Sequence, residues 1–208
     1  MKKNVILLLI VVVVILITGC SNAPKPETTV EGFLEASKEL DIVKMAEFVE
    51  KSEIEDQEIF DEFEEIEEGS LEASFMDYLK ENASKMTYDI SGSTVEDDKA
   101  TVDVDVKYVD GGSVMKATIV EVFTKVFAGA FAGVEYSEEE TNQIFISELN
   151  NQREKITETF VEKSIRIDCV LIDDKWYITN LDTEILDVIL SNFVSVSEEL
   201  DEDFSDEE

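Results

Sequence analysis

Apart from carboxylates, few side chains in this sequence are suited to acid–base or nucleophilic chemistry. The chain contains no histidine and two cysteines, Cys20 and Cys169. Without histidine, serine–histidine catalysis, cysteine–histidine catalysis and histidine zinc sites are excluded. An aspartate base with a tyrosine donor in an apolar pocket remains open, and four tyrosines are candidate donors: Tyr88, Tyr108, Tyr136 and Tyr177. Because acids occur along the whole chain, spacing selects no pair, and we predict no catalytic residue, metal ligand or cofactor.

Cys169 lies in an apolar, β-rich run, in phase with Ile165, Ile167 and Leu171. This phase predicts a small buried side chain on the inner face of a strand. The alternative is a reactive thiol, but no cluster of Lys and Arg is near in sequence to lower its pKa. If Cys20 is modified, no intramolecular disulfide can form, and stability must come from packing.

Acidic residues dominate the charge of the chain. It has 50 Asp and Glu residues against 17 Lys and Arg residues, a formal charge of −33 at pH 7. Nucleic-acid binding needs clustered Lys and Arg to neutralise phosphates, so this composition argues against a nucleic-acid partner. Apolar residues still make up 44% of the chain, which is enough material for one hydrophobic core.

The first residues have the pattern of a signal peptide. Lys2 and Lys3 precede an unbroken run of thirteen aliphatic residues, from Val5 to Ile17. A membrane-spanning helix needs about 20 apolar residues, whereas a run of this length is typical of the apolar region of a signal peptide. The alternative is an uncleaved membrane anchor in which Cys20 has no special role.

This segment ends in a four-residue motif that resembles the lipobox of bacterial lipoproteins: Ile17, Thr18, Gly19 and Cys20. The resemblance implies that Cys20 carries a diacylglyceryl group and a fatty acid such as palmitate. It also implies that residues 1–19 are removed and that the mature chain is held on the outer, extracytoplasmic face of the cell membrane. Two or more acyl chains anchor a protein stably. Residues 20–26 would then be a lipidated, proline-stiffened spacer that keeps the acidic domain away from an anionic leaflet.

Apolar residues at helical spacing predict several helices before residue 87. The spacing indicates helices over residues 27–39, over residues 42–49 with Asp41 as N-cap, and over residues 71–86. Residues 50–68 hold eleven acids and an apolar stripe, a pattern typical of a helix with one solvated acidic face. A loose divalent-cation site is the alternative, although this stretch lacks the Asp-x-Asp-x-Asp-Gly loop of a calcium site.

Two β-hairpins are predicted where the apolar period changes to two. Residues 87–95 and 100–109 alternate between apolar and polar, as strands with one wet face do. The second hairpin joins residues 157–172 to residues 175–179 through a turn at Asp173 and Asp174. Both hairpins are expected in one antiparallel sheet.

Residues 113–155 separate these hairpins and predict a helical-hairpin insertion. Helical spacing starts at Met115 and runs for about five turns, although β-branched residues in the first half also suit a strand. The segment from Ser137 to Glu140 has the form of a capping box at the start of a second helix. Three phenylalanines at helical spacing are expected to pack in the core, and the alternative is that they line a ligand cavity: Phe123, Phe127 and Phe131.

The C-terminal part predicts one more helix and a tail. Asp182 is expected to cap a helix whose apolar face runs from Ile185 to Phe193. Residues 197–208 are mostly acidic and keep no apolar period, so we expect a disordered acidic tail. The pattern therefore indicates a single domain over residues 27–196.

Two segments resemble small Gram-positive lipoproteins that have a nuclear-transport-factor-like cone fold and no known function. One runs from Pro26 to Ala36 (PETTVEGFLEA) and is followed by MAEFV, ending at Val49; the other is DDKWYI, ending at Ile178. The resemblance implies an α+β fold in which N-terminal helices pack on a curved antiparallel sheet, with a C-terminal helix. It also implies that Trp176 and Ile178 face the helix that the sheet encloses. The helical insertion departs from the pattern of this group.

Three classes of function are compatible with these patterns. The first is a non-enzymatic, membrane-anchored module that binds a small ligand or another envelope protein. The second is an acidic surface or spacer protein, and the third is a cone-fold enzyme that uses Asp and Tyr. We favour the first class, because no catalytic constellation is recognisable. The expected partners are the membrane, through the lipid on Cys20, and an unidentified ligand or envelope protein.

Overall fold

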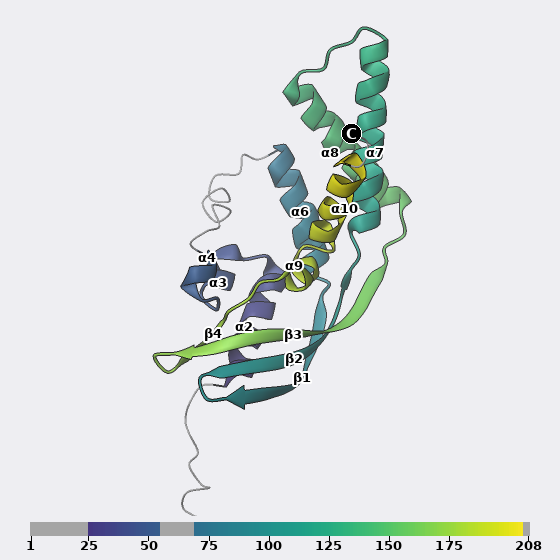
Figure 1. Cartoon of the computed structure of the whole chain (residues 1–208). Coiled ribbons are helices and arrows are strands. Elements are labelled where there is room, and N and C mark those ends of the chain that lie inside the picture. The colour runs from purple at the N-terminus through teal and green to yellow at the C-terminus, as the bar shows by residue number, and fades with distance from the viewer. Residues whose placement is uncertain (1–24, 55–68, 206–208) are drawn as a thin grey trace, which may run out of the picture.

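The computed structural model describes residues 25–54 and 69–205 of the chain. These residues form four N-terminal helices, a four-stranded sheet, a helical hairpin and two C-terminal helices (Figure 1). The leader, the lipobox and nearly all of the predicted spacer lie outside the described residues. The described part is an α+β fold with helices packed against an antiparallel sheet, as the sequence predicted.

The elements follow one another in the order in which the sequence predicted them. The N-terminal helices are α2 (Pro26–Glu39), α3 (Ile42–Ala46), α4 (Lys51–Ile54) and α6 (Leu71–Ala83). The sheet has the order β1-β2-β3-β4, with β1 (Thr87–Glu96), β2 (Lys99–Val109), β3 (Phe160–Ile172) and β4 (Lys175–Ile178). Between β2 and β3 lie α7 (Gly112–Phe131) and α8 (Glu138–Lys155), and the chain continues with α9 (Thr183–Ile189) and α10 (Phe193–Ser205). Both predicted β-hairpins and the helical insertion are confirmed.

The inner face of the sheet is filled by apolar side chains. Alternate residues of β2 point inward and are buried, while the residues between them are accessible to solvent. The helix α2 packs on this face through Val30, Phe33 and Leu34. On β4, Trp176 and Ile178 are buried in the same cluster, as the resemblance implied. The inner face of the sheet is therefore a packed core.

Local signals explain the ends of several elements. The Asp41 side chain accepts a hydrogen bond from the Lys44 amide at 3.0 Å and so begins α3, as predicted. Asp173 and Asp174 both have positive φ values, 49° and 62°, which suit the tight turn between β3 and β4. Asp182 caps α9 by accepting from the Ile185 amide at 3.0 Å.

The C-terminal prediction is wrong in two respects. The expected helix through Phe193 is interrupted, because Ser191 and Asn192 adopt positive φ values of 57° and 64°. Beyond this break, α10 occupies residues 193–205, most of the segment that we expected to be a disordered tail. Leu200 packs against a second apolar cluster at the base of the helical hairpin. Leu200 and Phe204 are the only apolar residues in segment 197–208, too few to give a period, so the contact that orders α10 could not be read from the sequence.

The predicted helix over residues 42–49 is shorter than expected. It ends at Ala46, and within it Met45 is buried whereas Val43 is 71% exposed. Most of the acidic stretch 50–68 lies outside the described residues. The predicted solvated face and the alternative cation site belong to this part of the chain.

Candidate interaction surface

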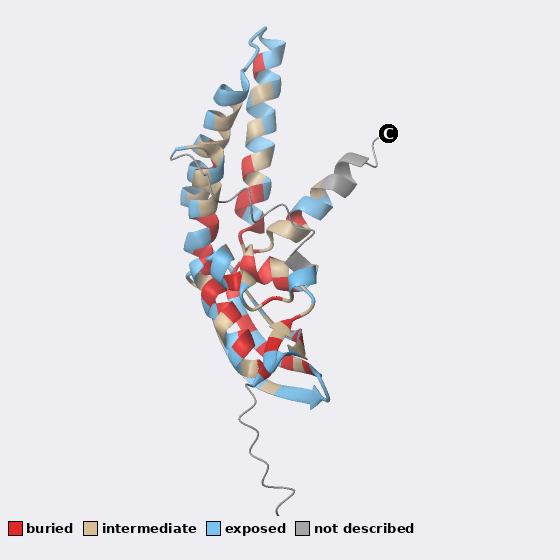
Figure 2. Ribbon diagram, turned by 90° about the vertical axis from the view of Figure 1, so that its left-hand side faces the viewer, coloured by how far each residue is buried: buried red, intermediate tan, exposed pale blue. Residues whose placement is uncertain are grey.

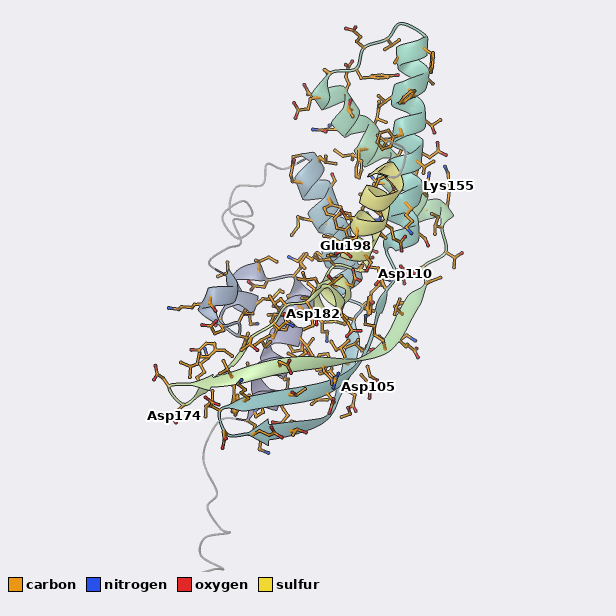
Figure 3. The ribbon with its side chains drawn as sticks, viewed as in Figure 1. Asp105, Asp110, Lys155, Asp174, Asp182 and Glu198 are labelled. Atoms are coloured by element: carbon orange, nitrogen blue, oxygen red, sulfur yellow. The ribbon has the colours of Figure 1, made fainter. Side chains whose placement is uncertain are left out.

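The helical hairpin of α7 and α8 extends beyond the end of the sheet (Figure 1). Its base is fastened by the segment between β2 and α7. The Asp110 carboxylate accepts from the Gly112 amide at 3.1 Å and from Asn192 Nδ2 at 3.0 Å. The Gly111 amide donates to the Ser191 carbonyl at 3.0 Å. These bonds tie the start of α7 to the link between α9 and α10, and Figure 3 shows Asp110 at this junction.

Close packing explains the two glycines at this base. A Cβ on Gly112 would lie 2.8 Å from Val196 Cγ2, and one on Gly111 would lie 2.9 Å from the Tyr78 hydroxyl. Distances this short require a neighbour to move. The Asp-Gly-Gly segment that ends β2 therefore lets α6 and α10 approach the hairpin.

A narrow apolar seam joins α7 to α8 near the base. Met115 and Leu149 are buried there, in the second apolar cluster. Glu148 is also buried, and its carboxylate accepts hydrogen bonds from Lys125 and, at 3.2 Å, from Asn151. The hydrogen bond from Lys125 lowers the pKa of Glu148. The buried acid is thus paired, as a stable interior requires.

The tip of the hairpin is built by local signals. The Val134 amide donates to the Gly129 carbonyl at 2.9 Å, and Gly133 has a φ of 78°, which together form a Schellman end to α7. A Cβ on Gly129 would overlap the Tyr136 ring, which folds back over this turn. The predicted capping box of Ser137 begins α8. The tip is therefore a defined turn that positions the end of α7.

One face of α7 is turned away from α8 and carries large apolar side chains. Val120, Phe127 and Phe131, here called the outward face of α7, are 59%, 63% and 87% exposed. The Phe127 and Phe131 rings contact each other, with centroids 6.1 Å apart. Figure 2 shows that buried residues of the hairpin concentrate at its base and that exposed residues dominate toward its tip. Exposed apolar patches of this kind mark interaction sites in many proteins.

The expectation for the phenylalanines of α7 is therefore corrected. Phe127 and Phe131 neither pack in the core nor line a cavity, and Phe123 is half exposed. Helical spacing showed that these rings share a face. It did not show that the hairpin extends past the sheet, where no other described element buries the end of that face. The outward face was missed because the sequence pattern of an interface resembles that of a core.

The charges around the outward face are mainly negative. The Lys116 ammonium is paired with Glu199 of α10, and Lys125 is paired with Glu148. On α7 itself, Glu121 is exposed next to Val120. Near the start of α7, α10 contributes Glu198, which is labelled in Figure 3. The apolar stripe thus has exposed acids beside it.

The residues that the sequence offered for chemistry lie elsewhere. Cys20 and the lipobox are outside the described residues. Cys169 is buried in the inner face of the sheet, as predicted, and burial raises the pKa of its thiol to about 12. At neutral pH the thiol is therefore protonated, which disfavours the alternative of a reactive cysteine.

Among the four candidate tyrosines Tyr108 is the buried one, Asp187 is a buried aspartate, and hydrogen bonds within the chain occupy both. The Tyr108 hydroxyl donates to Asn192 Oδ1 at 2.7 Å, and burial raises the pKa of this tyrosine to about 12. The Asp187 carboxylate accepts hydrogen bonds from both the amide and the hydroxyl of Ser195. Asp187 thereby caps the start of α10. Tyr108 thus joins β2 to the link between α9 and α10, and Asp187 joins α9 to α10.

The other three candidate tyrosines lie on different surfaces. Tyr88 donates to Glu35 at 2.7 Å, which joins β1 to α2. Tyr136 covers the tip of the hairpin, and Tyr177 lies under the Lys175 ammonium, 4.7 Å from its ring centroid. The structure does not bring these tyrosines together with one another.

Most residues that line the hollows of the described surface are polar. One of about 550 Å³ is lined by exposed residues of the β1–β2 turn, such as Glu96 and Lys99, together with Asp168. A smaller one of about 70 Å³ lies between α6 and α8 and is lined by Asn82, whose buried Nδ2 has no hydrogen-bond partner. A volume of this size suits about two water molecules. Neither hollow has the apolar lining that is typical of a small-molecule site.

No group of three or more acids or cysteines within residues 25–54 and 69–205 is arranged to hold a metal ion. Within the same residues, no helix combines the length and the apolar character needed to cross a membrane. Comparison of the chain with protein-family models, with curated proteins and with solved structures finds no match.

Proposed function

We propose that this protein is an extracytoplasmic lipoprotein, anchored through Cys20, that binds another protein with the outward face of α7. The observation that carries the proposal is the exposure of Val120, Phe127 and Phe131 on a hairpin that extends from the body. Most large apolar residues of the described part are buried or partly buried. A group of exposed aromatic rings on an acidic protein lowers its solubility, and binding of a partner is the usual reason for such a patch.

The lipobox resemblance supports the anchor, and the geometry is compatible with it. The helix α2 begins beside β1, where Glu27 accepts a hydrogen bond from Ser93 at 2.7 Å. The hairpin tip lies at the opposite end of the molecule (Figure 1). An anchor at Cys20, a few residues before α2, would therefore hold the outward face of α7 away from the membrane.

The likeness to nuclear-transport-factor-like lipoproteins is part of the same proposal. It is supported by the packing of α2 against the residues of the closing motif: the Thr29 hydroxyl donates to the Trp176 carbonyl at 3.2 Å. Because the inner face of the sheet is filled by side chains, we place binding on the hairpin surface and not in a cone cavity. The proposed activity is therefore association with a macromolecule.

Two experiments test the two halves of the proposal. For the anchor, cells that express the wild type or Cys20→Ala are labelled with palmitate, and only the wild type should take up label and be cleaved before residue 20. Equal labelling of both would contradict lipidation at Cys20.

For the surface, the size of the anchored protein in mild detergent is compared among wild type, Phe127→Ser/Phe131→Ser and Val43→Ser. Val43 is a matched control, because it is an equally exposed apolar residue on α3. We expect wild type and Val43→Ser to migrate in a larger complex and the double variant to migrate alone. A complex that survives the double substitution would place binding elsewhere.

A further inference from the structure

The apolar side chains on the outward face of α7 are spaced so that another helix could pack along them. Val120 and Phe127 are seven residues apart, which is about two turns, and Phe131 follows one turn later. The three side chains therefore form a stripe along the helix axis. Anchors at such spacing are typical of amphipathic helices that pack along one another.

The size of the stripe limits what can bind it. A phenylalanine side chain contributes about 200 Å², so the exposed parts of Phe127 and Phe131 offer about 300 Å² of apolar surface. A stable complex of two folded proteins buries about 800 Å² on each partner. The stripe alone is too small for such an interface, whereas it suits one face of a single helix.

The charges near the stripe decide the character of that helix. Both lysines of α7 are engaged by glutamates of this chain, and exposed acids of α7 and α10 lie beside the stripe. A second copy of the chain, with its own formal net charge of −33, would be repelled. An anionic leaflet would also repel this end of the molecule. A segment with Lys and Arg beside its apolar stripe is instead attracted.

On these grounds, and resting on the proposed function, we propose that the outward face of α7 binds an amphipathic helix whose apolar stripe is flanked by Lys and Arg. The rings of Phe127 and Phe131 contact the apolar stripe of the partner. Glu121 of α7 and the acids of α10 pair with its basic flanks. The aromatic rings supply the affinity, and the acids select a basic partner.

The test uses three synthetic peptides of about five helical turns. The first has leucines on one face and Lys or Arg on both flanks. The second keeps the leucines and replaces every base with Glu, and the third is a scrambled form of the first without an apolar face. Binding of each is measured by fluorescence anisotropy, at about 150 mM salt, to the chain without its first 20 residues, which keeps every described residue.

We expect the first peptide to bind, and the second and third to bind at least tenfold more weakly. Phe127→Ser/Phe131→Ser should weaken binding of the first peptide at least tenfold, whereas Val43→Ser should leave its Kd unchanged. Because the substituted rings are exposed, far-UV circular dichroism should be the same for all variants.

Four outcomes overturn the inference. If the double substitution leaves the Kd of the basic peptide unchanged, the peptide is attracted by the acids of the protein in general and not by the outward face of α7. Equal binding of the acidic peptide would show an apolar surface without charge selection. Sedimentation with vesicles of equal parts phosphatidylglycerol and phosphatidylcholine that depends on Phe127 and Phe131 would show a lipid surface. Self-association in ultracentrifugation that depends on the same rings would show a second copy.

Failure of this inference is separable from failure of the proposed function. If the acidic peptide binds through the same rings, or if the chain self-associates through them, the surface binds protein and only the partner chemistry is wrong. If the double substitution changes nothing in any assay, including migration of the anchored complex, the outward face of α7 is not a binding surface.

Discussion

The substitution of phenylalanine by alanine at Phe33 and at Phe131 gives a direct contrast between a core ring and a surface ring. Phe33 has no exposed area and packs between α2 and the sheet. Removing a fully buried phenylalanine costs about 3 to 5 kcal/mol. A domain is stable by about 5 to 15 kcal/mol in total, so Phe33→Ala should leave the protein close to unfolding.

The expected loss at Phe131 is much smaller. Only about one eighth of its surface is buried, which is about 25 Å², and at about 25 cal/mol per Å² this is about 0.6 kcal/mol. Alanine also has the higher helix propensity, which offsets part of this loss. We therefore expect Phe131→Ala to change the free energy of unfolding by less than about 0.5 kcal/mol.

Urea unfolding measures both variants. Trp176 is the single tryptophan of the chain and is buried beneath α2, so its fluorescence reports the body, while far-UV circular dichroism reports the hairpin as well. A loss above about 1.5 kcal/mol for Phe131→Ala by either probe would refute the reasoning, because it would mean that the ring is packed in solution.

Three further measurements test other parts of the structure. Burial raises the pKa of Cys169 to about 12 from 9.0, so a thiol reagent at pH 8 should label the native protein about 1,000-fold more slowly than the unfolded chain. Because the unfolded chain releases this proton at lower pH, the free energy of unfolding should fall from pH 9 toward pH 12. Comparable labelling rates in the two states would show that the thiol is accessible. Asp182→Ala should lower the free energy of unfolding by about 1 kcal/mol through loss of the cap of α9, whereas Asp98→Ala, at an exposed turn position without a positive φ, serves as a control. Ending the chain at Val196 should cost about 1 to 2 kcal/mol, because it removes Leu200 and the Glu199 partner of Lys116; unchanged urea unfolding would mean that α10 contributes nothing.

Local signals made much of the fold predictable. Some features depend only on neighbours in sequence: the alternation along residues 100–109, the two-acid turn at Asp173, and the caps at Asp41, Ser137 and Asp182. Each is confirmed by the strands and helices of the structure.

Features that depend on distant contacts were not predictable. Leu200 packs against the base of the hairpin, whose residues lie about 50 or more positions earlier in the sequence. The sequence around Leu200 itself looks like an acidic tail. Phe127 and Phe131 have the spacing of core residues, and only the position of α7 beyond the sheet exposes them. Periodicity identifies a face of a helix but not what that face meets.

The most direct test of the central claim is photo-cross-linking of the anchored protein in intact cells. A photoreactive residue is placed at position 131, on the outward face of α7, and in a second strain at position 43, which is exposed on α3. The account predicts one discrete cross-linked protein species from position 131, lost when Phe127 is replaced by Ser, and none from position 43. Equal cross-linking from the two positions, or none from position 131, would contradict the account.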